Sequence, residues 1–179
     1  MKKTLTFLGA MVVGFLLMGC APTQQPTTIK FNMIEANHQA AKKLLDDANL
    51  SLGTSVMMTT VVNIDEIEKS STLGRQISEH VASYCVQRGM SVTEMKIRDN
   101  IYIKQNEGEL MLTREISKLA KVHSATAIII GTYAISDSAI YVTLKMVDPN
   151  TNIVMAASDY ALPLNHDTTE MLGKKSRLF

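Results

Sequence analysis

The stretch "ATAIIIGTYAISDSAIYVTLKMV", residues 125–147, contains two strand patterns joined by a short turn. Residues 125–135 are apolar on both faces, as in a central strand that helices cover on at least one side. Residues 139–147 alternate, with one apolar face formed by Ile140, Val142, Leu144 and Met146. Only Ser136, Asp137 and Ser138 separate the two patterns, so we predict that the strands are antiparallel neighbours.

The chain that follows extends this hairpin. "DPNTN", residues 148–152, consists of turn-forming residues. "IVMAASDYAL", residues 153–162, then has the composition of a last strand. The last three strands are therefore predicted to form an antiparallel meander.

Two further strand patterns lie upstream. They are "SVMMTTVVNI" (residues 55–64) and "SVTEMKI" (residues 91–97), the second continuing into "NIYIK" (residues 100–104) after a turn. A helical pattern separates the first two, and strands joined through a helix can pair in parallel. We expect parallel pairing among these first strands.

Three helices are predicted between the strands. The first covers residues 33–48, where Asn32 can cap the helix and Glu35 completes a capping-box pattern. Its apolar residues do not form a clean stripe along one face of the helix. They are Ile34, Ala40, Ala41, Leu44, Leu45 and Ala48. The second begins at Ser70 or Ser71 and ends at Arg88-Gly89. The third covers about residues 113–123.

These patterns predict the fold class α/β, as a mixed α+β sandwich. One mixed sheet has parallel first strands and a C-terminal antiparallel meander, with helices packed mainly on one face. We assign the domain to residues 32–164 and predict a flexible tail over residues 165–179.

The N-terminus has the features of a secretion signal over residues 1–19. Lys2 and Lys3 precede an apolar stretch, residues 5–18, which is shorter than the roughly 20 residues that span a bilayer. Leu17-Met18-Gly19-Cys20 resembles a bacterial lipobox, in which the cysteine thiol is acylated. Cys20 is therefore the predicted lipidation site, and a plain signal peptide or an unprocessed tether is the alternative.

Residues 20–31 would then form a lipidated anchor and a polar spacer, since residues 21–30 ("APTQQPTTIK") carry two prolines and several threonines and glutamines. Two or more acyl chains hold a protein on a membrane firmly, whereas one holds it marginally. Ala21 follows the cysteine, and in the sorting pattern of enterobacterial lipoproteins that residue implies export to the outer membrane. The expected location is the periplasmic side of the outer membrane.

The sequence offers little support for catalysis. His38, His80, His123 and His166 are scattered without metal-ligand spacing, and no phosphate-binding loop occurs. Cys85 lies on the apolar side of the second helix, where a buried, inert thiol is expected. Gly131 interrupts an apolar strand and indicates a bulge or close packing. A net charge of +1 without a basic block argues against nucleic acid. We expect no enzyme activity, cofactor or metal.

Four segments together resemble the FlgO domain of flagellar outer-membrane lipoproteins. They are "QRGMSVTEMKIRDNI" (87–101), "GELMLTREISKLA" (108–120), "IIIGTYA" (128–134) and "VDPNTNIVMAAS" (147–158), within residues 73–158. The resemblance implies a non-enzymatic lipoprotein that supports flagellar assembly or stability and motility, as part of an outer-membrane-associated ring. The implied partners are the membrane, through Cys20 acyl chains, and other basal-body or envelope proteins.

Two further expectations concern self-association and an alternative function. A homo-oligomer is expected, with an edge strand at residues 139–147 or 153–162 offering unpaired backbone groups to another copy. The alternative function is a lipid-anchored periplasmic binding module that activates or scaffolds a cell-envelope enzyme or a secretion channel.

Overall fold

The computed structural model describes residues 31–95, 118, 120–121 and 123–173. The chain divides into two units, residues 1–30 and 31–179, and all described residues belong to the second. Several predictions lie outside the described residues: the signal, Cys20, the spacer up to residue 30, the strand after residue 95 and most of the third helix. Within that helix, Lys118, Ala120 and Lys121 are described and are helical, as predicted.

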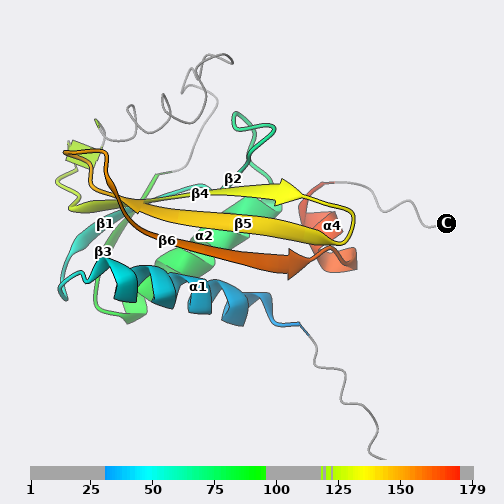
Figure 1. Cartoon of the computed structure of the whole chain (residues 1–179), viewed down its shortest axis with the longest axis horizontal. Coiled ribbons are helices and arrows are strands. Elements are labelled where there is room, and N and C mark those ends of the chain that lie inside the picture. Colours follow the sequence, from blue (N-terminus) through cyan, green and yellow to red (C-terminus); the bar gives the residue numbers. More distant parts are fainter. Residues whose placement is uncertain (1–30, 96–117, 119, 122, 174–179) are drawn as a thin grey trace, which may run out of the picture. The chain divides into compact units, whose positions relative to one another are not determined.

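The strands form one mixed sheet in the order β3-β1-β4-β5-β6, with β2 also paired to β4 (Figure 1). Their bounds are β1 Ser55–Thr59, β2 Val62–Asn63, β3 Ser91–Met95, β4 Ala127–Ile135, β5 Ala139–Val147 and β6 Val154–Pro163. β1 pairs with β3 and β4 in parallel, whereas β5 is antiparallel to both β4 and β6. The predicted fold class and pairing directions are confirmed.

Two details of the sheet differ from the prediction. Residues 55–64 are divided into β1 and β2, because the Val61 N–H donates to Ser78 Oγ of the second helix (2.8 Å). The hairpin strand at residues 139–147 is no edge strand, since β5 lies between β4 and β6. Among the described strands, β3 and β6 end the sheet, so only the second of the two predicted edges is correct.

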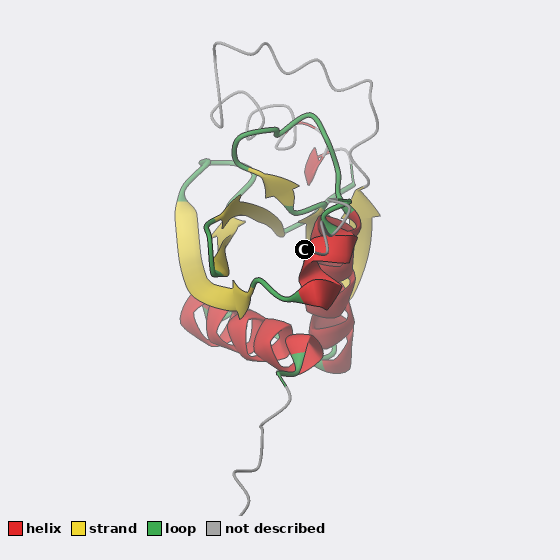
Figure 2. Cartoon of the chain, turned by 90° about the vertical axis from the view of Figure 1, so that its right-hand side faces the viewer, coloured by secondary structure: helices red, strands yellow, loops and turns green. Residues whose placement is uncertain are grey.

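Helices α1 (Met33–Ala48) and α2 (Thr72–Gln87) pack on one face of the sheet. Figure 2 shows these two long helices together below the strands. The inward side chains of β5 are the four predicted ones, and all are buried: Ile140, Val142, Leu144 and Met146. They pack in one apolar cluster with residues of both helices, which places the main core between the helices and the sheet.

Helix α1 begins as predicted and buries four of its predicted apolar residues, Ala40, Ala41, Leu44 and Leu45, but two positions differ from the expectation. The Asn32 side chain accepts hydrogen bonds from the N–H groups of Ile34 and Glu35, whereas the Glu35 carboxylate accepts from Gln39, so no reciprocal box forms. Ile34 is 50% exposed, and Asn37 is fully buried in its place. A polar side chain therefore occupies a core position of this helix.

The predicted flexible tail is wrong for residues 165–173. Helix α4 (His166–Met171) follows β6, and its N-terminus carries a full capping box between Asn165 and Thr168. Thr168 is buried, and its hydroxyl also donates to the Pro163 carbonyl (2.9 Å). These bonds hold the short helix against the end of β6.

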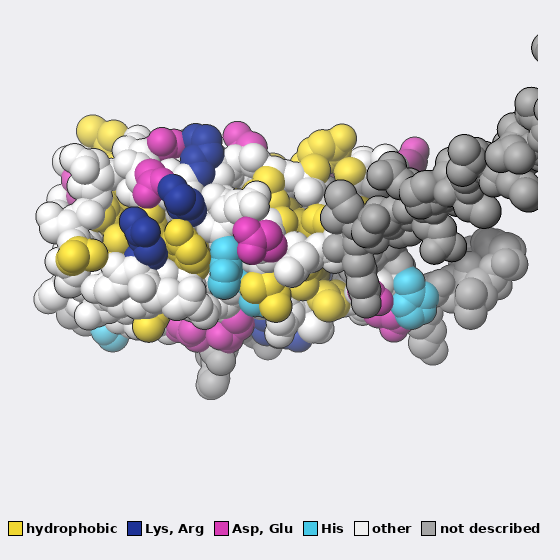
Figure 3. Space-filling view, turned by 90° about the horizontal axis from the view of Figure 1, so that it is seen from below, with side chains coloured by type: hydrophobic (Ala, Val, Ile, Leu, Met, Phe, Trp, Pro, Cys, Tyr) yellow, Lys and Arg dark blue, Asp and Glu magenta, His cyan; other side chains and the backbone are white. Residues whose placement is uncertain are grey.

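The surface seen from the α1 side carries acidic and basic side chains interspersed with apolar ones (Figure 3). On α1, Lys42 pairs with Asp46 and Lys43 pairs with Asp47, each one turn apart. Exposed pairs of this kind stabilise a helix only slightly. None of the described helices is both long and apolar enough to cross a membrane.

Candidate functional site

Cys20, the predicted lipidation site, lies outside the described residues, so lipidation remains a prediction. The other cysteine, Cys85, is fully buried on α2. Burial raises the pKa of its thiol to about 11. Because the thiolate is the reactive species, Cys85 is unsuited to nucleophilic chemistry at neutral pH.

The fold brings together two histidines that lie in separate segments of the sequence. His38 of α1 lies edge-on to His80 of α2, with 6.5 Å between ring centroids. His123 and His166 belong to other parts of the chain, and among the described residues no group of histidines, cysteines and carboxylates could hold a metal ion.

Asn37, His80 and Tyr160 form a polar junction between α1, α2 and β6. The Tyr160 hydroxyl donates to Asn37 Oδ1 (2.5 Å), and Asn37 Nδ2 lies 2.8 Å from His80 Nδ1. Since Oδ1 accepts from the tyrosine, Nδ2 must donate, and His80 must be neutral with its proton on Nε2. The junction therefore links three elements of the core and requires an uncharged imidazole.

The pKa of His80 lies below its ordinary value of 6.5, because burial and then the neighbouring His38 disfavour the charged ring, while Glu79 opposes them. The unfolded chain thus binds a proton more readily than the folded one near pH 6. We expect the contribution of His80 to the free energy of unfolding to be fully present above pH 6.5 and to be lost as the pH drops through 6.5 toward the lower folded pKa.

Urea unfolding of the full chain in detergent at several pH values between 8 and 5 measures this effect. His80→Gln is the matched variant, because it keeps a hydrogen-bonding side chain without titrating. Acidification should lower the unfolding free energy of wild type more than that of His80→Gln. If the difference between the two proteins does not change with pH, His80 does not have a lowered pKa in the folded state.

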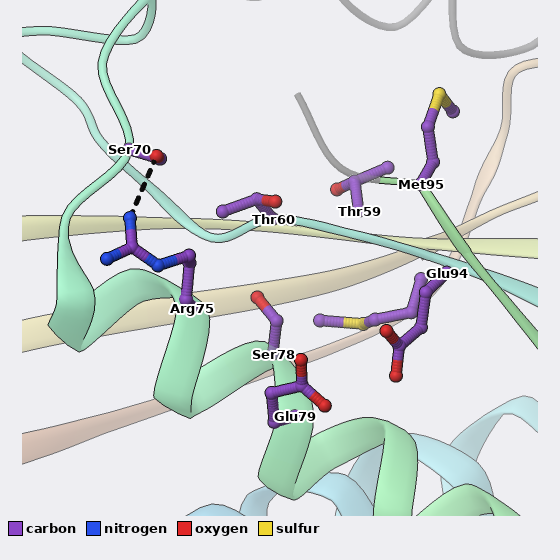
Figure 4. Close-up of a pocket in the computed structure, with 9 residues that line it drawn as sticks. Thr59, Thr60, Ser70, Arg75, Ser78, Glu79, Glu94 and Met95 are labelled. Carbon is purple, nitrogen blue, oxygen red and sulfur yellow. Dashed lines mark hydrogen bonds between the residues drawn. The ribbon is translucent and has the colours of Figure 1, made fainter. Parts of the chain in front are cut away.

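A pocket of about 60 Å³ opens between α2 and the carboxyl ends of β1 and β3 (Figure 4). Ligands of parallel α/β sheets bind at this end of the strands. Side chains from β1, the β1–β2 turn, the segment before α2, α2 and β3 line it: Met58, Thr59, Thr60, Ser70, Arg75, Ser78, Glu79, Glu94 and Met95. The pocket combines apolar walls with charged groups.

The charges in this pocket are separated (Figure 4). The Arg75 guanidinium donates to the hydroxyls of Ser70 (3.2 Å) and Thr72 (3.0 Å), which hold it at one end. Glu79 and Glu94 lie toward the other end, and no hydrogen bond or ion pair joins either carboxylate to a described residue. Among the described residues that line the pocket, two carboxylates against one guanidinium leave an excess negative charge.

Two glycines pack closely against Val61. A Cβ atom on Gly131 would lie 2.8 Å from side-chain atoms of Leu144 and Val61, so this glycine serves close packing, one of its two predicted roles. Gly74 of α2 is more constrained still, since its Cβ would lie 2.0 Å from the Val61 carbonyl oxygen. Ser78, one turn later, bonds to both the β1–β2 turn and its own helix, and it lines the pocket.

Sequence reasoning did not find the pocket or the polar junction. Glu79 and Glu94 are ordinary surface residues in their own segments, and only the β1–α2–β3 crossover brings them together. The sequence contains one weak signal for the polar junction: Asn37 is a polar residue within the ragged apolar face of the first helix.

The fold and its surface define a class of protein: a small mixed α+β domain with a polar pocket and, among the described residues, no metal-binding cluster. A family model described as FlgO protein matches residues 38–167. The chain therefore belongs to the FlgO family, and the predicted resemblance is confirmed.

Comparison with solved structures gives the same fold. The LpoB C-terminal domain from Escherichia coli is 9% identical, with a TM-score of 0.56 over 74% of this chain and 98% of that one. The LpoB C-terminal domain from Salmonella enterica is also 9% identical, with a TM-score of 0.54 over 73% and 98%. At this identity the likeness concerns the fold alone. The search of curated proteins returned no significant match.

Proposed function

We propose that the protein is an outer-membrane lipoprotein, anchored through Cys20, that supports flagellar assembly or stability without catalysing a reaction. The observation that carries this proposal is the FlgO family match over residues 38–167. The lipobox at Leu17–Cys20 supports it independently, because it lies outside the matched region. A lipid anchor confines the domain to a plane and so raises its effective concentration for neighbouring proteins.

Cys20→Ser is expected to release the domain from the membrane. Without the thiol no acyl chain can be attached, and each buried methylene of such a chain contributes about 0.8 kcal/mol of membrane affinity. Membrane fractionation and the mass of the N-terminal peptide measure the outcome. Wild type should sediment with outer membranes and carry an acylated N-terminal cysteine. An unmodified Cys20 in mature wild type would contradict lipidation, and Cys85→Ser is the control that should behave as wild type.

Co-isolation with flagellar basal bodies tests the proposed role. Basal bodies prepared with their outer-membrane parts from cells that produce wild type should contain the protein, and those from Cys20→Ser cells should contain much less. Its equal absence from both preparations, with normal membrane anchoring, would count against a flagellar role.

The second candidate is a lipid-anchored periplasmic module that activates or scaffolds an envelope enzyme or a secretion channel. The pocket between α2 and the strand ends favours a binding role, since it presents two carboxylates that have no partner among the described residues. In vivo cross-linking from the domain surface separates the candidates, because it identifies either basal-body proteins or an enzyme or channel.

We further propose that copies of the chain associate through the edge of β6. Among the described strands, β6 pairs only with β5, which leaves its other edge to offer N–H and C=O groups. Proline should be placed at positions of β6 whose N–H groups point away from β5. These variants should reduce association of the full chain in detergent, as measured by sedimentation, without unfolding it. Undiminished association in every such variant would exclude this edge.

A further inference from the structure

We propose that the pocket between α2 and the ends of β1 and β3 binds a lysine or arginine side chain of a partner protein, with Glu79 and Glu94 holding the cation. This inference goes beyond the proposed function, because it concerns the pocket alone and applies whether the partner belongs to the flagellum or not.

The charge of the pocket selects a cation. Glu79 lies on α2 and Glu94 on β3, so two different elements direct carboxylates to one opening (Figure 4). Neither carboxylate has a hydrogen-bond or ion-pair partner among the described residues. No ion pair joins Arg75 to either carboxylate, and the hydroxyls of Ser70 and Thr72 accept from its guanidinium at the other end of the pocket.

The Thr60 side chain provides independent support for a ligand. Thr60 is only 7% exposed and lines the pocket, yet its hydroxyl has no hydrogen-bond partner among the described residues. Every fully enclosed polar side-chain atom in the described part of the chain has a partner. The Thr60 hydroxyl oxygen is therefore not fully enclosed, and a group bound in the pocket can donate to it or accept from it.

The walls and size of the pocket favour one long side chain. Met58 is 2% exposed and Met95 is partly buried, so two flexible thioethers form apolar surface next to the carboxylates. The aliphatic stem of lysine or arginine packs on such surface while its charged head reaches the carboxylates. A volume of about 60 Å³ exceeds the roughly 15 Å³ that one water needs. It is far below the roughly 300 Å³ of sites for larger ligands.

Methionine methyl NMR of the full chain in detergent tests this inference directly. The chain has 12 methionines, of which Met58 and Met95 line the pocket. Three blocked tripeptides serve as probes: acetyl-Gly-Lys-Gly-amide, the norleucine analogue that keeps the stem without the charge, and the glutamate analogue. The lysine peptide should move the Met58 and Met95 signals in a saturable way, and the other two should not. The buried Met146 signal should stay fixed as an internal reference.

Three variants assign the interaction to named groups. Glu79→Gln and Glu94→Gln should each weaken binding of the lysine peptide by up to about fivefold, as expected for an exposed ion pair. Thr60→Val should weaken it by a similar factor. Because the Thr60 hydroxyl has no partner in the free protein, this variant should leave folding unchanged. Glu68→Gln, an exposed residue outside the pocket lining, is the control and should bind as wild type.

Three results would overturn the proposal. They are equal binding of the norleucine peptide, preferential binding of the glutamate peptide through Arg75, and undiminished binding in both glutamine variants. An unchanged Met146 signal in each variant shows that its core is intact, so a loss of binding cannot be attributed to unfolding. None of these results bears on membrane anchoring or basal-body association.

Discussion

Gly74→Ala is expected to lower the free energy of unfolding by about 3 kcal/mol. In an open helix the same change stabilises by about 1 kcal/mol, because alanine has the higher helix propensity. Here the added Cβ would lie 2.0 Å from the Val61 carbonyl oxygen, which is a backbone atom and cannot rotate away. Relief requires that α2 moves away from the β1–β2 turn.

That movement would disturb a connected set of hydrogen bonds. Ser78 Oγ accepts from the Val61 N–H (2.8 Å) and donates to the Gly74 carbonyl (2.8 Å). Ser71 caps the helix by accepting from the Gly74 N–H (3.0 Å), and the Tyr133 hydroxyl donates to Ser71 (2.8 Å). The start of α2 is therefore fixed to the sheet at several points, which is why a single methyl group has a large effect.

Urea unfolding of the full chain measures the loss. Ser83→Ala is the matched control, because Ser83 lies on the exposed side of the same helix and should change stability by no more than about 0.5 kcal/mol. A Gly74→Ala protein as stable as wild type would show that α2 does not approach Val61 as described.

Asn37→Ala is expected to cost about 3 kcal/mol, although alanine is again the better helix former. Asn37 is fully buried and serves both the Tyr160 hydroxyl and His80 Nδ1. Its removal leaves both groups without their partner in a region where water cannot replace it fully. An unsatisfied buried polar group costs about 1–3 kcal/mol.

A double-mutant cycle with Tyr160→Phe separates the junction from simple loss of packing. Tyr160→Phe alone removes one hydroxyl and should cost about 1–2 kcal/mol, since Asn37 Oδ1 loses its donor. Combined with Asn37→Ala it should add little, because the bond is already absent. Gln39→Ala, on the exposed side of α1, is the control. Strictly additive losses would contradict a shared hydrogen bond.

The sheet was the most predictable part of this protein. The alternation of residues 139–147 reflects a strand with one face on the core, and all four predicted inward residues are buried. The connections determined pairing direction, since short turns force antiparallel neighbours and the α2 crossover allows β1 and β3 to be parallel. Strand order was harder to predict from the sequence, because the alternation pattern does not distinguish a central strand from an edge strand.

Side-chain contacts between distant segments could not be predicted in the same way. Asn37 and Tyr160 are 123 residues apart, and a single sequence contains no signal that links them. The same holds for Glu79 and Glu94, which meet only after α2 has packed on the sheet. Helix α4 was missed because six residues with one buried side chain have almost no apolar periodicity. Its capping pair, Asn165 and Thr168, was the available local signal.

Swimming speed and filament number in a strain that lacks this gene test the central claim most directly. The strain is complemented in parallel with wild type, Cys20→Ser and Cys85→Ser. If the protein is an anchored part of the flagellar apparatus, the deletion should lose motility and filaments, and wild type and Cys85→Ser should restore them while Cys20→Ser does not. Normal swimming and normal filament numbers in the deletion strain would contradict the flagellar role.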